Sequence, residues 1–342
     1  MQKSLVNGIP EQEPRNHALT GRDEGGFFLK KKTRQGISAG ESNSGFAIAA
    51  VLMPRDSAGR LDEQALGASL QFLLDKGIRQ FALNGATGEF CRVTEKELAQ
   101  LLEATARRVP KDATLLCGVG AASLQESVRL AHVAAEGGAS ALLAPMPYFF
   151  PYAQEDLEAF ALGLADASPL PVLLYNLPQF TSGLEVETVL RLLRGHERII
   201  GIKDSSGSLE IVRAITREGL PASRIMGNDG ALAQALVEGV CDGVVSGVAC
   251  VLPEVIQALF ATRPGDAEFV RAAGLLQEFI AQIDVLPTPW GLKVIAEARK
   301  LAAATYSLPV AASRAAQIAA IQRWFAAWMP AACAELAARI TN

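Results

Sequence analysis

The chain has 342 residues, of which 50% are hydrophobic and 20% charged, and its formal net charge is −4. A chain of this size and composition can bury a large core, which excludes the collagen-like, low-complexity and natively disordered classes. The negative net charge argues against nucleic-acid binding, which needs a basic surface. The basic cluster at 30–34 is expected to be a solvent-exposed stretch.

The pattern along the chain predicts three parts. Residues 1–44 are polar and aperiodic and are expected to form an N-terminal extension. From Gly45 onwards, short apolar runs alternate with stretches of helical period. Strands are predicted at Ala47–Met53, Gln80–Leu83, Thr114–Gly118, Ala141–Pro145, Val172–Tyr175, Ile199–Lys203, Arg224–Met226 and Gly243–Ser246, and helices at 62–76, 95–108, 124–136, 155–166, 185–194, 208–218, 230–239 and 252–261.

Unbroken alternation of eight strands with eight helices predicts an α/β fold, a (β/α)8 TIM barrel, over residues 45–262. A doubly wound parallel sheet is the alternative. Residues 263–342 are Ala-rich and are predicted to add a C-terminal helical layer, with helices near 266–284, 290–304 and 311–338. This layer could pack on the barrel or on another subunit.

Other sequence features limit the possible partners and the location of the protein. No run of about 18 apolar residues is present, so no membrane partner is expected. The first thirty residues carry acidic side chains and no apolar core, which argues against a signal peptide. Five cysteines without a Cys-x-x-Cys pair favour a cytoplasmic location, and because the three histidines are widely scattered we expect no metal site.

Lys203 is the most informative residue for chemistry. It closes the apolar run 199–202, which places its side chain at the end of a barrel strand. Burial disfavours an ammonium and lowers a lysine pKa, so that the free amine becomes a nucleophile able to form a Schiff base with a carbonyl substrate. A structural ion pair with the adjacent Asp204 is the alternative.

Tyr175 ends the preceding strand. Because neighbouring barrel strands lie about 5 Å apart, its phenol could reach an imine on Lys203 and move a proton there. A packing role for this tyrosine is the alternative.

Two glycine-containing loops follow strands and bear on ligand binding. Gly85-Ala86-Thr87-Gly88 could place backbone amides and a hydroxyl on a carboxylate, or be a plain tight turn. The segment 118–123 superficially resembles a dinucleotide fingerprint, but no acidic residue stands about twenty positions further on. We therefore expect no NAD and no other cofactor.

Together these motifs resemble the dihydrodipicolinate synthase / N-acetylneuraminate lyase family of class I aldolases. The motifs are Gly-x-Thr-Gly-Glu at 85–89, Tyr-Asn-x-Pro at 175–178 and Gly-x-Lys-Asp-Ser-Ser-Gly at 201–207, with Pro-Tyr-Phe-Phe-Pro at 147–151 and Thr-Pro-x-x-x-Lys at 288–293. They occur in the family's order over about residues 45–304.

The resemblance implies a (β/α)8 barrel assembled as a homotetramer or homodimer, and a small-molecule partner that is pyruvate or another 2-oxo acid. It also implies roles for single residues. Lys203 would form the imine and Tyr175 would shuttle the proton, while Thr87 and the Ala86 amide bind the carboxylate. Val245 would line the pyruvyl pocket, and Asp229 and Ser246 lie where sugar-acid members hold substrate hydroxyls.

Three positions depart from the synthases of this family. Ala86 replaces a relay threonine, Phe149 replaces a relay tyrosine from the neighbouring subunit, and Phe180 replaces an arginine that binds the aldehyde's carboxylate. We therefore expect a lyase that makes or breaks a bond next to a pyruvyl unit, by aldol reaction or by dehydration of a 2-keto-3-deoxy sugar acid. The alternatives are a true 4-hydroxy-tetrahydrodipicolinate synthase and a catalytically silent homologue that binds a 2-oxo acid.

Overall fold

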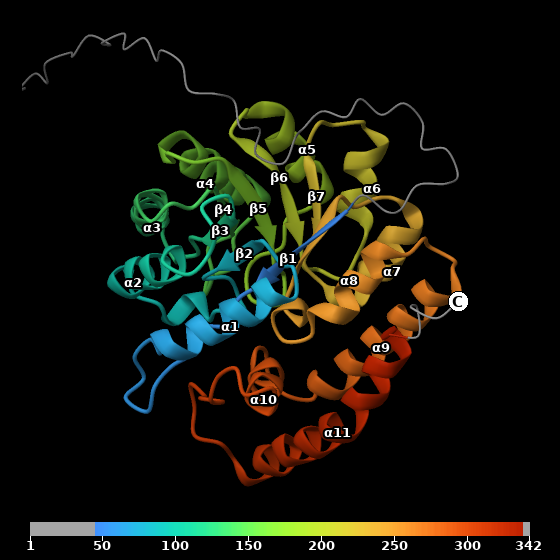
Figure 1. Cartoon of the computed structure of the whole chain (residues 1–342). Helices are drawn as coiled ribbons and strands as arrows, with labels where there is room; N and C mark the ends of the chain where they lie inside the picture. Colours follow the sequence, from blue (N-terminus) through green and yellow to red (C-terminus); the bar gives the residue numbers. More distant parts are fainter. Residues whose placement is uncertain (1–44, 338–342) are drawn as a thin grey trace, which may run out of the picture. The chain divides into compact units, whose positions relative to one another are not determined.

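The computed structural model describes residues 45–337, and the predicted N-terminal extension lies outside the described residues. Eight parallel strands close into a barrel in sequence order, as the alternating pattern predicts (Figure 1). The strands are β1 (Phe46–Ala50), β2 (Gln80–Leu83), β3 (Thr114–Gly118), β4 (Ala141–Pro145), β5 (Val172–Asn176), β6 (Ile199–Asp204), β7 (Ser223–Met226) and β8 (Gly243–Ser246).

A helix follows each strand and covers the outside of the barrel (Figure 1). These helices are α1 (Glu63–Asp75), α2 (Glu95–Ala106), α3 (Leu124–Glu136), α4 (Gln154–Ala167), α5 (Val186–Gly195), α6 (Glu210–Arg217), α7 (Asp229–Glu238) and α8 (Pro253–Ala261). Local sequence sets their starts: at α2, for example, the Thr94 hydroxyl accepts from the Glu97 amide while the Glu97 carboxylate accepts from the Thr94 amide.

Three further helices form the C-terminal layer: α9 (Ala267–Ile283), α10 (Trp290–Ala298) and α11 (Ala312–Ala337). Helix α9 packs on α8 and α7 of the barrel, so the C-terminal layer contacts its own barrel. An aromatic cluster joins α9 to α11, since the Phe279 ring lies 5.9 Å from that of Trp328, which stacks on Trp324 at 5.0 Å. These pairs add packing energy to a helix pair rich in small residues.

Two predicted ends are wrong by three residues or more. The apolar run of the first strand continues to Met53, but β1 ends at Ala50. The Val51 amide makes the last hydrogen bond to β2, with the Ala82 carbonyl, and the described chain then leaves the sheet. The helix predicted to reach residue 304 ends at Ala298, because Lys300 adopts a left-handed conformation with φ of 59°.

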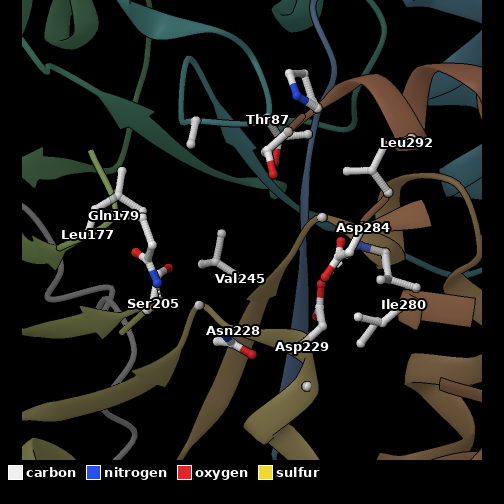
Figure 2. Close-up of a pocket in the computed structure, with 18 of the residues that line it drawn as sticks. Thr87, Leu177, Gln179, Ser205, Asn228, Asp229, Val245, Ile280, Asp284 and Leu292 are labelled. Atoms are coloured by element: carbon white, nitrogen blue, oxygen red, sulfur yellow. Dashed lines mark hydrogen bonds between the residues drawn. The ribbon is translucent and has the colours of Figure 1, made fainter. Parts of the chain in front are cut away.

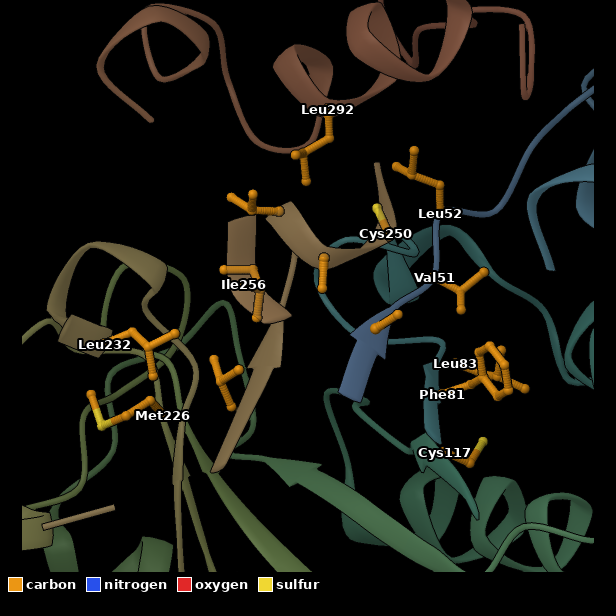
Figure 3. Close-up of a cluster of buried hydrophobic side chains, with 14 of the residues drawn as sticks. Val51, Leu52, Phe81, Leu83, Cys117, Met226, Leu232, Cys250, Ile256 and Leu292 are labelled. Atoms are coloured by element: carbon orange, nitrogen blue, oxygen red, sulfur yellow. The ribbon is translucent and has the colours of Figure 1, made fainter. Parts of the chain in front are cut away.

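A continuous apolar core lies between the strands and the helices (Figure 3). Phe81, Ala82 and Leu83 of β2 are all buried, as a parallel strand covered on both faces requires. Leu292 from α10 belongs to the same cluster as Val51 and Leu52. The C-terminal layer is therefore continuous with the barrel core, and it brings the segment between α9 and α10 to the end of the barrel where the strands terminate.

Candidate active site

A pocket of about 400 Å³ lies at the carboxyl ends of the strands, where TIM-barrel enzymes carry their active sites. Its lining combines the loops after β2, β5, β6, β7 and β8 with the segment that joins α9 to α10 (Figure 2). The residues expected from the sequence that line it are Ala86, Thr87, Tyr175, Phe180, Lys203, Asp229 and Val245.

Lys203 and Tyr175 meet inside this pocket. They are register partners on β6 and β5, and their side chains are only 4% and 2% exposed. The Lys203 Nζ atom lies over the Tyr175 ring, 3.8 Å from its centroid. A buried amine and a phenol are thus in contact at the wall of a cavity large enough for a small molecule.

A bulge in β6 produces this pairing. Val172 pairs with Ile199, but the next residue of β5, Leu173, pairs with Gly201, so β6 holds one extra residue at this point. Gly201 has φ of 157°, and a Cβ atom there would lie 2.3 Å from the Ser223 carbonyl oxygen. Both features favour glycine at this position.

Asp204 does not pair with Lys203, so that alternative is wrong. Successive side chains of a strand point to opposite faces, and Asp204 Oδ1 accepts instead from Asn176 Nδ2 at 3.0 Å and from the Ser206 amide at 2.9 Å. Burial raises the pKa of the Asp204 carboxyl above its usual range, against these hydrogen bonds. Its Oδ2 atom is buried without a partner among the described residues.

The loop after β2 is held from two sides. Asn84 Nδ2 donates to the Gly118 carbonyl at 2.8 Å, and the Glu89 carboxylate accepts from Lys293 Nζ of α10 at 2.5 Å. Lys293 also donates to the Thr305 carbonyl. The Thr-Pro-x-x-x-Lys segment therefore fixes the loop that carries Thr87 into the pocket.

Asp229, the first residue of α7, lies in contact with Ser246, the last residue of β8. Asp229 Oδ2 accepts from the Val248 amide at 3.1 Å, and the Ser246 hydroxyl is also hydrogen-bonded to this carboxyl. Burial raises the pKa of Asp229 despite these bonds. Ser246 is fully buried and does not line the pocket, so it positions Asp229 rather than reaching the cavity itself.

The two phenylalanines expected near the substrate differ in place. Phe180 lines the pocket and is half exposed. Phe149 does not line the pocket of its own chain: it is 84% exposed, has φ of 83°, and packs edge-to-face on Phe150 with ring centroids 4.8 Å apart.

Sequence reasoning missed several polar residues of the lining. Ser205 belongs to the strand-6 motif, yet its role was not recognised; its Oγ atom is buried without a partner among the described residues. Gln179 Nε2 donates to the Ser205 carbonyl at 2.9 Å. Asn228 follows β7, and Asp284 follows α9, where no strand precedes it to indicate a site.

Nothing in the described part of the chain, residues 45–337, groups three or more His, Cys, Asp or Glu side chains in a way that could hold a metal ion. Across the same residues, no helix is both long and apolar enough to cross a membrane.

The fold and the pocket define a (β/α)8-barrel lyase of the class I aldolase type, the class in which a lysine amine forms a Schiff base with a carbonyl substrate. The chain belongs to the dihydrodipicolinate synthetase family, whose model matches residues 43–323.

Curated relatives agree with this membership. A 4-hydroxy-tetrahydrodipicolinate synthase of Pseudomonas putida is 31% identical over 253 residues, which cover 72% of this chain and 86% of the relative. A protein of Streptomyces coelicolor named 4-hydroxy-tetrahydrodipicolinate synthase 1 is 35% identical over 217 residues, covering 63% and 70% of the two chains.

Solved structures show the same fold. The dihydrodipicolinate synthase of Aquifex aeolicus superposes with a TM-score of 0.77 at 22% identity, covering 83% of this chain and 98% of that one. YagE of E. coli K12, solved in complex with pyruvate, gives a TM-score of 0.75 at 24% identity, with the same coverage. At this identity the likeness concerns the fold alone.

Proposed function

We propose that Lys203 forms an imine with the carbonyl carbon of a pyruvyl unit and that Tyr175 moves the protons of this reaction. The single observation that carries the proposal is the contact of a buried amine with a buried phenol in the wall of the pocket. Thr87 and the Ala86 amide bind the carboxylate of the pyruvyl unit, and Val245 packs against it. Asp229, held by Ser246, accepts hydrogen bonds from substrate hydroxyls.

The chemistry balances with these groups alone. The amine adds to the carbonyl and water leaves, giving an imine that acts as an electron sink. Loss of a proton or cleavage of a carbon–carbon bond next to it gives an enamine, and Tyr175 accepts or returns the proton. Reprotonation or addition to an aldehyde, followed by hydrolysis, releases the product and the free lysine.

The distal part of the substrate is neutral under this proposal. Lys203 is the only cationic side chain lining the pocket among the described residues, and Phe180 offers no donor. A synthase that uses aspartate semialdehyde must hold a second carboxylate, and leaving it unpaired costs several kcal/mol. The names of the curated relatives favour the synthase as the second candidate. Condensation of pyruvate with aspartate semialdehyde is its direct assay, and we expect little activity.

Borohydride reduction in the presence of pyruvate tests the imine. We expect a covalent adduct on Lys203, located by mass spectrometry of the digested protein, and its loss in Lys203→Met. Lys96→Met, which removes an exposed lysine of α2, is the matched control and keeps the adduct. An adduct elsewhere, or none, contradicts the proposed mechanism.

A substrate screen read by release of pyruvate separates an enzyme from a silent homologue. A silent homologue gives the Lys203 adduct and no turnover with any 2-oxo acid. We also propose a homotetramer or homodimer, which sedimentation measures, and a cytoplasmic location, for which five unpaired cysteines are the support. We further propose that the N-terminal extension ends at residue 44 and the barrel at residue 262, boundaries that limited proteolysis can test.

A further inference from the structure

Two buried oxygen atoms of the pocket have no partner in the described structure, and the exposed Asp284 carboxylate at its rim has none either. The Ser205 Oγ atom and the Asp229 Oδ1 atom are buried and unpaired, and the Ser205 side chain is only 6% exposed. Asp284 lines the same pocket without an ion pair or a side-chain hydrogen bond. Unpaired buried oxygens in a binding pocket are the groups that a ligand is expected to satisfy.

Asp284 follows the last turn of α9. Its backbone amide donates to the Ile280 carbonyl at 3.0 Å, which fixes the main chain at the rim of the pocket. Figure 2 shows Asp284 and Asp229 on one side of the cavity and Gln179 and Ser205 on the other. The Asp284 side chain is exposed, and the partial desolvation it meets beside the pocket raises the pKa of its carboxyl.

The charges of the lining are unbalanced. Lys203 is the one basic side chain among the described residues that line the pocket, and the proposed imine occupies its amine, whereas Asp229 and Asp284 are both acidic. A carboxylate accepts hydrogen bonds and cannot donate them. A ligand that satisfies these groups must therefore bring donors. A distal carboxylate would add a second ligand charge, beyond that of the pyruvyl unit, to a cavity that already holds two acidic side chains.

We propose that Asp284 is a specificity-determining residue that accepts hydrogen bonds from hydroxyl groups on the distal chain of the substrate and excludes a distal carboxylate. This inference rests on the proposed function, because it concerns the part of the substrate beyond the pyruvyl unit. The substrate class it names is a 2-oxo acid with a neutral, hydroxylated tail.

Two six-carbon 2-oxo acids test the inference without any need for turnover. 2-Keto-3-deoxygluconate has a hydroxylated tail, and 2-oxoadipate ends in a carboxylate. The measured quantity is the concentration of each that half-saturates borohydride trapping of Lys203. We expect half-saturation of the wild type at a concentration about tenfold lower with the hydroxylated acid, the size of effect that one added like charge gives at about 10 Å in a partly solvated site.

Asp284→Asn removes the charge and keeps the shape. We expect this variant to bring the two half-saturation concentrations about five- to tenfold closer together, chiefly by improving the binding of 2-oxoadipate. Glu278→Gln, an exposed position on α9 outside the pocket, is the matched control and should leave the ratio as it is.

The two proposals fail in different ways. If pyruvate gives no adduct on Lys203 in the wild type, the proposed function is wrong. If pyruvate is trapped normally but the wild type does not discriminate, or the ratio is the same in the wild type and Asp284→Asn, only the role of Asp284 is overturned.

Discussion

Lys203 lies opposite Tyr175 because β6 holds one residue more than β5 between their first paired residues and this contact. Without the extra residue, the register would pair Lys203 with Asn176 and turn its side chain to the other face of the sheet. The amine would then point into the layer between the strands and the helices. The bulge at Gly201 is therefore what places the amine in the pocket.

Gly201→Ala should disturb this placement. The added Cβ atom would meet a backbone oxygen, which cannot move aside as a flexible side chain can. We expect a loss of about 1–3 kcal/mol in the free energy of unfolding, measured by urea denaturation, together with loss of the Lys203 adduct. Gly195→Ala is the control, because a Cβ there has no atom within 4 Å; equal behaviour of the two variants would contradict the role of the bulge.

The sequence was sufficient for the barrel and for two of its reactive groups. Short apolar runs with helical stretches between them predict eight parallel strands, and a lysine at the end of such a run stands out. The bulge could not be predicted, because Ile200 is one more apolar residue in an apolar run. Asp284 and the Glu89–Lys293 pair were missed for another reason: each depends on how the C-terminal layer folds back over the barrel, across as many as 204 positions of sequence.

Tyr175→Phe should separate imine formation from proton transfer. The ring stays beneath Lys203 while the hydroxyl is lost, so pyruvate should still be trapped. General acid–base groups contribute about 10²–10⁴-fold, and we expect turnover in the pyruvate-release assay to fall by that factor. Normal turnover in this variant would assign the proton transfer to another group.

Asp204 should make stability depend on pH. Its pKa is raised in the folded protein, so the folded state holds the proton more tightly than the unfolded chain. This contribution is fully present below the unfolded value near 3.8 and is lost as pH rises through the folded pKa. Asp204→Asn cannot titrate. The difference in free energy of unfolding, wild type minus variant, should therefore fall as pH rises from about 4 to 8.

Asp229 and Asp284 also have raised pKa values, and they too make the free energy of unfolding of the wild type fall as pH rises. They are present in both proteins and cancel in the difference, which isolates Asp204. A difference that stays flat with pH would mean that Asn176 and Ser206 hold Asp204 ionised throughout.

Lys293→Met tests the pair that ties α10 to the loop after β2. Lys293 and Glu89 are 5% and 8% exposed. Removing one partner of a buried pair costs about 3–5 kcal/mol when the other charge is left unpaired. Because Arg92 still pairs with Glu89 at 3.0 Å, we expect a loss at the lower end of that range. Arg107→Met, in an exposed pair with Glu103, should change stability by less than about 1 kcal/mol. Similar losses in both variants would show that the Glu89–Lys293 pair has no special structural role. Glu89→Gln with Lys293→Met should recover much of the loss.

Gly227→Ala should displace the Lys203 side chain without unfolding the barrel. A Cβ atom at 227 would lie 2.6 Å from Lys203 Cε and 2.1 Å from Ser205 Oγ, and both of these are side-chain atoms that can rotate away. We therefore expect a modest loss of stability, about 1 kcal/mol, but a displaced amine and slow trapping by pyruvate. Gly274→Ala on α9, where a Cβ meets nothing within 4 Å, serves as the control. Trapping at the wild-type rate in Gly227→Ala would mean that the amine reacts from a position other than the one over Tyr175.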